Sequence, residues 1–458
     1  MAGGTYTGYS KKRPGAYINV NAPQKSVGSV ETTRGVVFFV GGNTLGWGPD
    51  GVIKLNAGSD FKKLLGHDIY ADDASDQLMA LRETLKAALT VLYYNINSGA
   101  EATYADEALP WKFTAKYPGT VGNNIRISVA KNAADISQTV VTTYFGTEQV
   151  DQQIVIGASQ LESNDYIDVE IVPTEDDGKT LLDALTASIT KSLAGGTTDT
   201  SAQVDTDALI SAMEIEQFNT VTAAGNDKDA PIHQLLVATV QRLREDFGQK
   251  IIAVIPSGQT GADYEGVIVV ANGVELSDGE VLSASIATGY VAGAEAAAAV
   301  NQSLTYAQYP GATAVNGRLS NDDTISALTN GKLLFTALRS GSVVIEEDIN
   351  SLHTYSANKS KSLSKNRVMR VLDDIAQNTK DTFEASFIGK VNNDAAGRDL
   401  FKANRIEYLT SLVNSGAIQQ FDGEDITVNP GAELDQVIVD LAVQPLDAME
   451  KLYMTVTI

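Results

Sequence analysis

Few residues of this chain have the type and spacing that catalysis or metal binding requires. It has no cysteine and only three histidines, and His67, His233 and His353 each lack a second histidine at ligand spacing. Ser257 follows a strand-like run but does not lie in the Gly-x-Ser-x-Gly turn that exposes a nucleophilic serine. The sequence therefore predicts no catalytic residue and no metal, although an α/β hydrolase-like enzyme using Ser257 or a histidine stays an alternative.

Two glycine-containing stretches lie where a nucleotide could bind. Residues 41–48 follow a strand-like run, but their spacing is not Gly-x-Gly-x-x-Gly and no helix begins directly after them. The Gly331-Lys332 pair lacks both the glycine five residues earlier and the serine or threonine that completes a phosphate loop. Neither stretch predicts a cofactor.

Five basic residues crowd at the beginning of a long predicted helix: Lys359, Lys361, Lys365, Arg367 and Arg370. Positive charges at a helix N-terminus oppose the helix dipole, so something else must favour them there. An acidic partner surface would do so by electrostatic complementarity. Acidic residues of the same chain, such as Glu347 and Asp348, would do so equally well, and the sequence leaves both explanations open.

The charge of the whole chain limits its partners. A net charge of −23 repels phosphate, so we expect neither nucleic acid nor an anionic membrane as a partner. The most apolar helical stretch, residues 291–300, is short and holds Glu295, which argues against a membrane span, and no signal-like run opens the chain. Residues 1–34 carry five basic residues and one acidic residue, whereas residues 421–458 carry one basic and eight acidic residues, so the two ends are electrostatically complementary.

The periodicity of apolar residues predicts a discontinuous α/β domain made of residues 23–99 and 196–335. Residues 36–40 form an unbroken apolar run, as in a strand buried on both faces. A helical pattern over 72–88 and a strand over 90–94 follow. The same alternation of strand and helix patterns resumes after residue 196. It predicts helices at 205–216, 231–247 and 289–300, and strands at 220–223, 250–255 and 266–270.

Residues 100–195 have a different pattern, which predicts a small β-rich insertion. Short alternating runs are separated by turn signals, and a single helix is expected near 179–191. Residues 336–458 then predict a C-terminal α+β domain, with helices at 364–387 and 394–414.

The last residues of the sequence are its most strand-like. Leu452, Met454, Val456 and Ile458 share one face of an alternating run, and Pro445 separates this run from a similar one at 436–443. An unpaired strand is an open edge that favours association. We therefore expect the partner of this strand to be another copy of the same chain.

Seven stretches in family order resemble the tail sheath proteins of contractile phage tails and phage-tail-like bacteriocins, of the type found with Gram-positive hosts. They are residues 13–19 (RPGAYIN), 115–124 (AKYPGTVGNN), 264–268 (YEGVI), 304–312 (LTYAQYPGA), 347–350 (EDIN), 365–373 (KNRVMRVLD) and 439–451 (VDLAVQPLDAMEK). They span the whole chain, and none carries catalytic chemistry. A surface-binding or host-binding protein is the remaining non-enzymatic alternative.

The resemblance implies a structural subunit that stacks in hexameric rings around a tube protein and contracts to drive the tube through a bacterial envelope. It implies baseplate and tail terminator proteins as further partners, and a virion tail or tail-like particle, assembled in the host cytoplasm, as the location. Residues 100–195 would face outward and residues 336–458 inward, with Lys359, Lys361, Lys365, Arg367 and Arg370 as the candidate tube contact.

The resemblance also implies that terminal strands are exchanged between neighbouring subunits. Residues 1–22 would be an N-terminal extended arm, and the exchanged strands would be residues of about 14–20 within it and residues 447–458 at the C-terminal end. Their pairing residues would be Tyr17, Ile18, Val20, Leu452, Met454, Val456 and Ile458.

Overall fold

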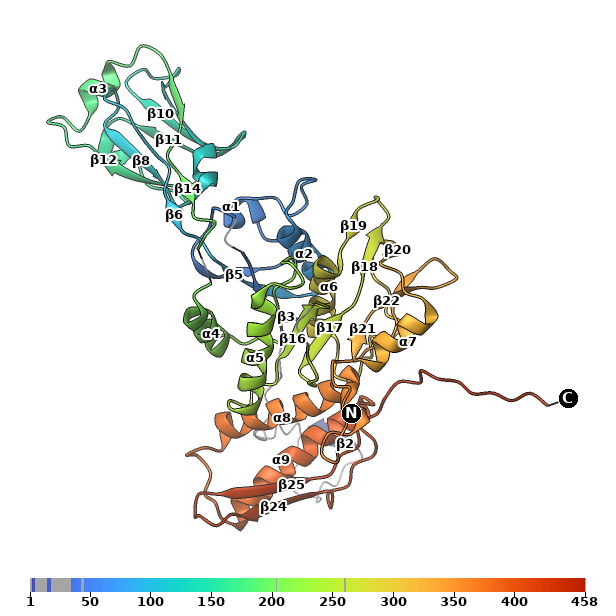
Figure 1. The fold of residues 1–458 in the computed structure, drawn as a ribbon. Coiled ribbons are helices and arrows are strands. Elements are labelled where there is room, and N and C mark those ends of the chain that lie inside the picture. Colours follow the sequence, from blue (N-terminus) through green and yellow to red (C-terminus); the bar gives the residue numbers. More distant parts are fainter. Residues whose placement is uncertain are drawn as a thin grey trace. The chain divides into compact units, whose positions relative to one another are not determined.

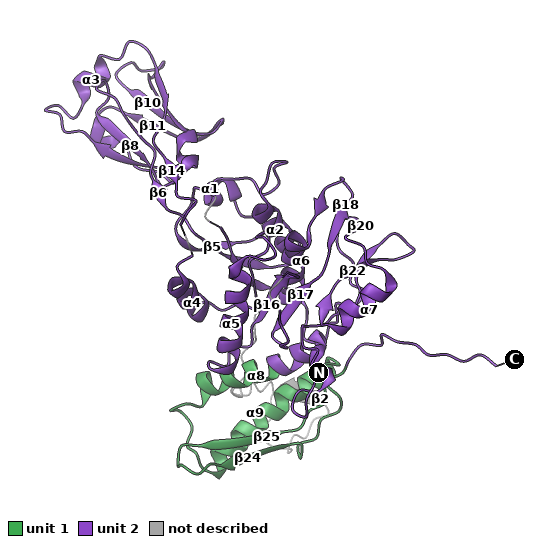
Figure 2. Ribbon diagram, in the orientation of Figure 1, with its two compact units in different colours: residues 1–32, 374–446 green, residues 33–373, 447–458 purple. Residues whose placement is uncertain are grey.

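The computed structural model describes residues 2–4, 15–17, 34–42, 45–202, 204–258 and 261–457. The chain divides into two compact units, which Figure 2 colours separately. Unit 1 comprises residues 1–32 and 374–446, and unit 2 comprises residues 33–373 and 447–458. Each unit is described by itself below.

The centre of unit 2 is a seven-stranded sheet that segments on both sides of the insertion complete together (Figure 1). Its strands lie in the order β21 (Lys332–Leu333), β17 (Val267–Val270), β16 (Ile252–Pro256), β15 (Thr220–Thr222), β3 (Val36–Val40), β5 (Thr90–Asn95) and β4 (Gly51–Leu55). All neighbours are parallel except β4 and β5. The predicted discontinuous α/β fold is confirmed.

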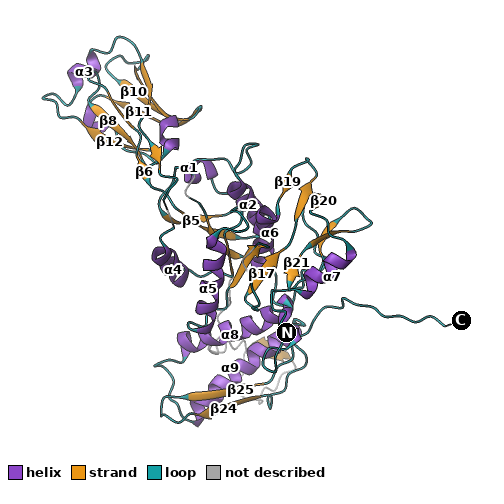
Figure 3. Ribbon diagram, in the orientation of Figure 1, coloured by secondary structure: helices purple, strands orange, loops and turns teal. Residues whose placement is uncertain are grey.

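Helices cover both faces of this sheet, which explains why its strands are continuously apolar (Figure 3). Along β3, Val37 and Phe39 pack with α2 (Asp76–Leu85) and α6 (Ala284–Ala297) on one face. Phe38 and Val40 pack with α4 (Thr206–Ile215) and α5 (Pro231–Glu245) on the other face. Two shorter helices, α1 (Phe61–Leu65) and α7 (Asn321–Thr329), complete this part of the unit.

Short strands accompany the large sheet. A three-stranded sheet joins β19 (Val281–Leu282), β18 (Gly273–Leu276) and β20 (Ala312–Asn316). Two further strands, β22 (Phe335–Ala337) and β23 (Val343–Ile345), form an antiparallel hairpin. Just before this hairpin, Lys332 and Leu333 form β21 and pair in parallel with β17 of the large sheet.

The insertion in unit 2 is a β-sandwich whose chain enters and leaves through the paired strands β6 (Gly99–Ala100) and β14 (Thr197–Thr198). One sheet has the order β11 (Glu148–Val155), β10 (Thr139–Phe145), β9 (Ile125–Lys131), β13 (Ile189–Ser192), and the other β12 (Ile167–Ile171), β8 (Trp111–Ala115), β7 (Thr103–Ala105). Trp111, Phe113 and Ile127 are among the core residues of the sandwich. Two 3-10 helices, η1 (Thr120–Asn124) and η2 (Ala158–Gln160), link its strands.

The helix predicted near 179–191 is wrong in its second half. Helix α3 (Lys179–Asp183) has only five residues, and the chain then forms β13, which pairs with β9. The leucine and isoleucine spacing of this stretch fits a helix, but pairing with a buried strand outweighs that local preference.

Unit 1 contains a helical pair and a β-hairpin. Helix α8 (Asn366–Ser386) follows the 3-10 helix η3 (Lys361–Ser364) and belongs to unit 1 from Asp374 onward. Asp394 caps α9 (Ala395–Asn414), and the antiparallel pair β24 (Ile426–Pro430) and β25 (Val437–Leu441) follows. The short parallel pair β1 (Ala2–Gly4) and β2 (Gly15–Tyr17) also belongs to this unit. Within the described ranges of both units, no helix is long and apolar enough to cross a membrane.

The close packing of α6 on α2 depends on glycines, and it supplies a stability prediction. A β-carbon at Gly293 would lie 2.3 Å from the carbonyl oxygen of Thr84 in α2. We expect Gly293→Ala to reduce the free energy of unfolding by about 1–3 kcal/mol, because the two helices must separate. Urea denaturation of the dispersed protein measures this, with Gly261→Ala as control, since no atom lies within 4 Å of a β-carbon built there. Equal midpoints for the two variants would contradict the packing argument.

Candidate functional site

Residues 447–457 form neither helix nor strand in the structure, although their sequence alternates like a strand. The side chains of Leu452, Met454 and Val456 are 87%, 75% and 74% exposed. Three apolar side chains on one face of an extended segment lie in water, which is unusual for a monomeric soluble protein. Ile458, the fourth predicted residue of this face, lies outside the described residues.

Glu450 attaches the beginning of this segment to unit 2. Its carboxylate accepts a hydrogen bond from the hydroxyl of Thr305 at 2.7 Å and forms an ion pair with Lys365. Lys365 also pairs with Glu347, so one ammonium group bridges two carboxylates. Burial alone would lower the pKa of Lys365, but the hydrogen bonds to Glu347 and Glu450 outweigh it and raise the pKa.

The basic cluster lies at the beginning of α8, and its members have different surroundings. Lys359 pairs with Glu265 at 2.8 Å and lies over the ring of Tyr264. Lys361 is exposed on η3, and Arg367 is half-buried. The structure thus contains acidic partners within the same chain for Lys359, Lys365 and Arg370. Neutralisation by acidic residues of the same chain is the second of the two explanations that the sequence left open.

Arg370 is the centre of a buried ionic network in unit 2. It forms ion pairs with Glu295 of α6 and, at 3.5 Å, with Asp348, and all three side chains are almost completely buried. Asn366 donates a hydrogen bond to Asp348 at 2.8 Å, and the backbone N–H of Leu304 donates a second one at 2.9 Å. The network fixes the first turn of α8 to α6.

Two carboxylates share one guanidinium in this network, so one of them is favoured in its neutral form. Burial and the negative charge of Asp348 raise the pKa of Glu295 to about 8, against the opposing effect of Arg370. Arg370 and hydrogen bonds outweigh the burial of Asp348 and lower its pKa. Of the two carboxyl groups, Glu295 therefore binds a proton more readily than Asp348.

The root of the exposed segment and the buried network are connected. The backbone N–H of Asp348 donates to the hydroxyl oxygen of Thr305 at 2.9 Å, and that hydroxyl donates to Glu450. Thr305 thus joins the network around Arg370 to the anchor of residues 447–457. This arrangement can hold and orient a segment.

A second buried ion pair, also missed from the sequence, lies further along α8. Arg244 of α5 donates to both carboxylate oxygens of Asp373, at 2.9 and 2.8 Å, and both residues are buried. Pattern analysis could not find such partners, because they lie up to 129 positions apart. Of these buried ionic residues, only Glu295 is conspicuous in the sequence, because it is a carboxylate inside an alanine-rich helix.

The hairpin of unit 1 has an apolar face that is only partly covered. Ile426 on β24 is 1% exposed, whereas Val439, on the same face of β25, is 39% exposed. Among the described residues this sheet has two strands only. A two-stranded sheet is marginally stable alone, and its outer edges have free backbone donors and acceptors.

Of the predicted N-terminal pairing residues, only Tyr17 is described, at the end of β2. Ile18 and Val20 lie outside the described residues, so the predicted N-terminal exchange stays a prediction.

Two of the histidines considered for catalysis, His233 and His67, contact backbone carbonyl groups. The buried ring of His233 contacts the carbonyl oxygen of Asp227 at 3.0 Å, and burial lowers its pKa. The ring of His67 contacts the carbonyl oxygen of Leu45 at 2.8 Å. In the part of the chain that the structure describes, no group of three or more acidic or histidine side chains could hold a metal ion.

Three family models match successive parts of the chain. They are the phage tail sheath protein beta-sandwich domain over residues 97–199, the phage tail sheath protein central domain over 199–351, and the phage tail sheath C-terminal domain over 358–458. The chain is also 36% identical to the phage-like element PBSX protein XkdK of Bacillus subtilis over the full length of both. The chain belongs to the phage tail sheath protein family.

Solved structures agree with this assignment. The crystal structure of the sheath tail protein from Desulfitobacterium hafniense is 35% identical, covers 96% of this chain and 99% of its own, and superimposes with a TM-score of 0.78. The helical sheath of the anti-feeding prophage in its contracted state, only 12% identical, shares the fold with a TM-score of 0.58 over 98% of this chain and 99% of its own. The resemblance and fold class inferred from the sequence are confirmed, and the chain is a structural sheath protein of a phage tail or tail-like particle.

The raised pKa of Glu295 supplies a pH prediction. Between the ordinary glutamate pKa of 4.5 and about 8, the folded chain binds one proton more than the unfolded chain at this residue. Stability from this group is therefore complete below pH 4.5 and is lost as pH rises toward 8, with a slope of up to about 1.4 kcal/mol per pH unit.

Denaturant unfolding of the wild-type sheath protein between pH 6 and 9 measures this slope, and Glu295→Gln is the matched control, because an amide cannot lose its proton in this range. We expect Gln to remove most of the decline between pH 6 and 8. The same slope in both proteins would mean that another group causes it.

Proposed function

We propose that this sheath protein polymerises into a helical lattice of hexameric rings around a tail tube and contracts to drive the tube through a bacterial envelope. Strand donation between copies holds the lattice together. The observation that carries the proposal is the exposed apolar face of residues 452–456, together with the half-covered hairpin β24–β25.

The hairpin β24–β25 has no third strand among the described residues, and its apolar face is only partly covered. Residues 452–456 have a strand-like sequence and exposed apolar side chains, so each feature could complete the other. A strand added to an edge of the hairpin forms main-chain hydrogen bonds, while its alternate side chains cover the apolar face. Burial of each of Leu452, Met454 and Val456 contributes about 1.5–3 kcal/mol. Together, the three contributions would stabilise the interface between the segment of one copy and the hairpin of another.

The anchor at Glu450 supports this role, because it leaves a defined length free. Residues 451–457 follow it and, when extended, span ~23 Å. A segment fixed at its root and free beyond it can reach a neighbour while the neighbour changes its orientation. This property suits a lattice that rearranges during contraction without dissociating, with a kinetic barrier separating the extended and contracted states.

For the tube contact we propose the exposed part of the basic cluster. Lys361 keeps an exposed side chain, and the side chain of Lys359 is 40% exposed. Lys365 and Arg370 are engaged within their own chain, so they act by holding the beginning of α8 in place. An acidic tube surface is the partner that this cluster fits.

Removal of the donated segment should separate assembly from folding. We expect a chain lacking residues 447–458 to stay folded, with an unchanged near-UV circular dichroism spectrum, but to form no tubes in electron micrographs. Leu452→Asp with Met454→Asp should act likewise, because both carboxylates would be buried on pairing. Tyr453→Asp with Thr455→Asp is the control on the opposite face and should form tubes. Tubes from the truncated chain would contradict strand donation.

Charge reversal at Lys361 tests the tube contact. We expect Lys361→Glu to weaken co-sedimentation with tube protein about tenfold at low salt and much less at 1 M salt, where charges are screened. Self-assembly of the variant without tube protein should be unchanged. Lys191→Glu, an exposed lysine of the insertion, is the control. Equal decoration of tubes by both variants would exclude Lys361 from the contact.

A further inference from the structure

A single loop of unit 2, residues 302–306, lies between the buried ionic network and the root of the exposed segment. The hydroxyl of Thr305 in this loop donates to Glu450 at 2.7 Å. The backbone N–H of Asp348 donates to the same hydroxyl oxygen at 2.9 Å. We call residues 302–306 the bridging loop. A shift of Asp348 therefore reaches the attachment of residues 447–457 through one side chain.

The network holds the bridging loop at two further points. Arg370 donates to the carbonyl oxygen of Gln302, and the carboxylate of Asp348 accepts from the backbone N–H of Leu304 at 2.9 Å. The residues that hold the loop are thus the same two residues that share charge with Glu295. The position of the loop therefore depends on the charge of this cluster.

The bridging loop is strained, so it needs these contacts. Tyr306 has a φ of 60° and is one of two non-glycine residues with a left-handed backbone among those that the structure describes. This conformation is costly for a residue with a β-carbon. The side chain of Tyr306 is mostly exposed, whereas its backbone N–H donates to the carbonyl oxygen of Ile345 at 2.8 Å. Such a loop relaxes when the contacts that hold it weaken.

The network is not completely paired in its closed arrangement. Nε of Arg370 and Oδ1 of Asn366 are buried and have no hydrogen-bond partner among the described residues. An unpaired buried polar group costs free energy, which contact with water recovers. Opening of this network is therefore less costly than opening of a completely paired one.

Charged groups face Glu295 from several segments. Asp348 and Arg370 contact its carboxyl group, and the guanidinium of Arg34 donates to its backbone carbonyl oxygen at 3.3 Å. Helix α2 also packs on α6, but its buried carboxylate, Glu83, forms an ion pair within α2 itself. The charge on Glu295 is thus balanced mainly by Asp348 and Arg370.

One proton decides whether this cluster is neutral. With a proton on Glu295, the negative charge of Asp348 matches the positive charge of Arg370. Without that proton, two almost completely buried carboxylates share one guanidinium, and the cluster has an excess negative charge. Such a charge is stabilised by water, which reaches the carboxylates only if the network opens.

We propose that Glu295, Asp348 and Arg370 form a proton-dependent latch for the root of the exposed segment. With the proton bound, the network holds the bridging loop, and Thr305 holds Glu450. When Glu295 loses its proton to the solvent, the network opens, the bridging loop relaxes and Glu450 is released from Thr305. The latch acts within one subunit, so it depends neither on strand donation nor on a lattice.

The latch opens as pH rises. Burial and the charge of Asp348 raise the pKa of Glu295 to about 8, so its deprotonated fraction grows roughly tenfold between pH 7 and pH 9. The pKa of Lys365, the other partner of Glu450, is raised by its acidic neighbours, so Lys365 stays charged over this range. A release between these two pH values therefore does not come from titration of Lys365.

A spin label beside Glu450 measures the release. The chain has no cysteine and the side chain of Met449 is fully exposed, so a nitroxide on Met449→Cys labels one site without disturbing the packing. Electron paramagnetic resonance spectra of the dispersed protein at pH 7 and pH 9 give the fraction of mobile label. We expect this fraction to be at least threefold higher at pH 9.

Three variants of the labelled chain identify the groups involved. Glu295→Gln has no proton to lose in this range, so its mobile fraction should stay at the pH 7 value. Thr305→Val lacks the hydroxyl that joins Asp348 to Glu450 and should remove the difference between the two pH values. Thr305→Ser keeps a hydroxyl at this position and should retain the difference.

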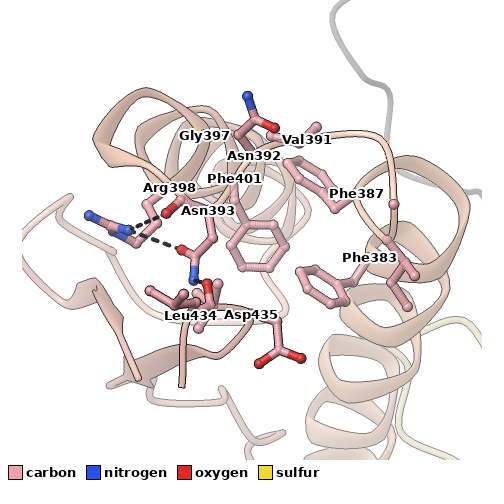
Figure 4. A pocket seen from close by; sticks show the side chains of 13 residues that line it. Phe383, Phe387, Val391, Asn392, Asn393, Gly397, Arg398, Phe401, Leu434 and Asp435 are labelled. Atoms are coloured by element: carbon pink, nitrogen blue, oxygen red, sulfur yellow. Dashed lines mark hydrogen bonds between the residues drawn. The ribbon is translucent and has the colours of Figure 1, made fainter. Parts of the chain in front are cut away.

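A label in unit 1 is the control for a general effect of pH. Leu434 is 97% exposed on the rim of an apolar pocket of about 460 Å³, opposite the rings of Phe383, Phe387 and Phe401 (Figure 4). Its carbonyl oxygen accepts a hydrogen bond from Asn393 at 2.9 Å, so the backbone there is held within unit 1. A nitroxide on Leu434→Cys should give the same spectrum at pH 7 and pH 9.

A pH response of the Met449 label that persists in Glu295→Gln would overturn the latch, because another group would then cause it. Equal mobility of this label at pH 7 and pH 9 in the otherwise unchanged chain would overturn it as well. Both results leave the proposed function standing, since tube formation tests that function separately.

Discussion

Backbone hydrogen bonding is the constraint on which the proposed assembly depends. Peptide groups at the edge of a sheet must pair with protein or with water, and apolar side chains beside them must find a surface. In this sheath protein the hairpin β24–β25 has two outer edges without a strand among the described residues, and residues 451–457 have no secondary structure. In the proposed lattice, residues 451–457 of one subunit therefore pair with the hairpin of another.

A segment that pairs with another subunit needs a fixed point of attachment in its own subunit. In unit 2 the ionic network provides this attachment at Glu450. Glu450 is held by Lys365 and Thr305, and Thr305 is hydrogen-bonded to Asp348 within the network around Arg370. Burial of charged groups is expensive, and it persists here because each carboxylate has a cationic or hydrogen-bonding partner. A fixed root followed by an exposed segment is the combination that the proposed contractile lattice needs.

Local patterns predicted much of the fold but not the contacts that position the segment. The run 36–40, the capped helix α2 and the strands of the large sheet followed from periodicity, because each has a continuous apolar face. The helical pattern over 179–191 wrongly includes residues 189–191, because their pairing with β9 depends on residues far away in the sequence. The partners of Arg370 and Lys365 were undetermined for the same reason, and the exchange of Tyr17, Leu452, Met454 and Val456 stays a prediction.

The central claim is that residues 451–457 become a strand of another subunit, and amide hydrogen exchange tests it most directly. Exchange rates of these amides are compared in the dispersed protein and in assembled tubes at the same pH and temperature. The account predicts exchange near the unfolded rate in the dispersed protein. In tubes, alternate amides of the segment should exchange at least a hundredfold more slowly, because they donate to a neighbouring backbone. Equal, fast exchange of these amides in both states would contradict it.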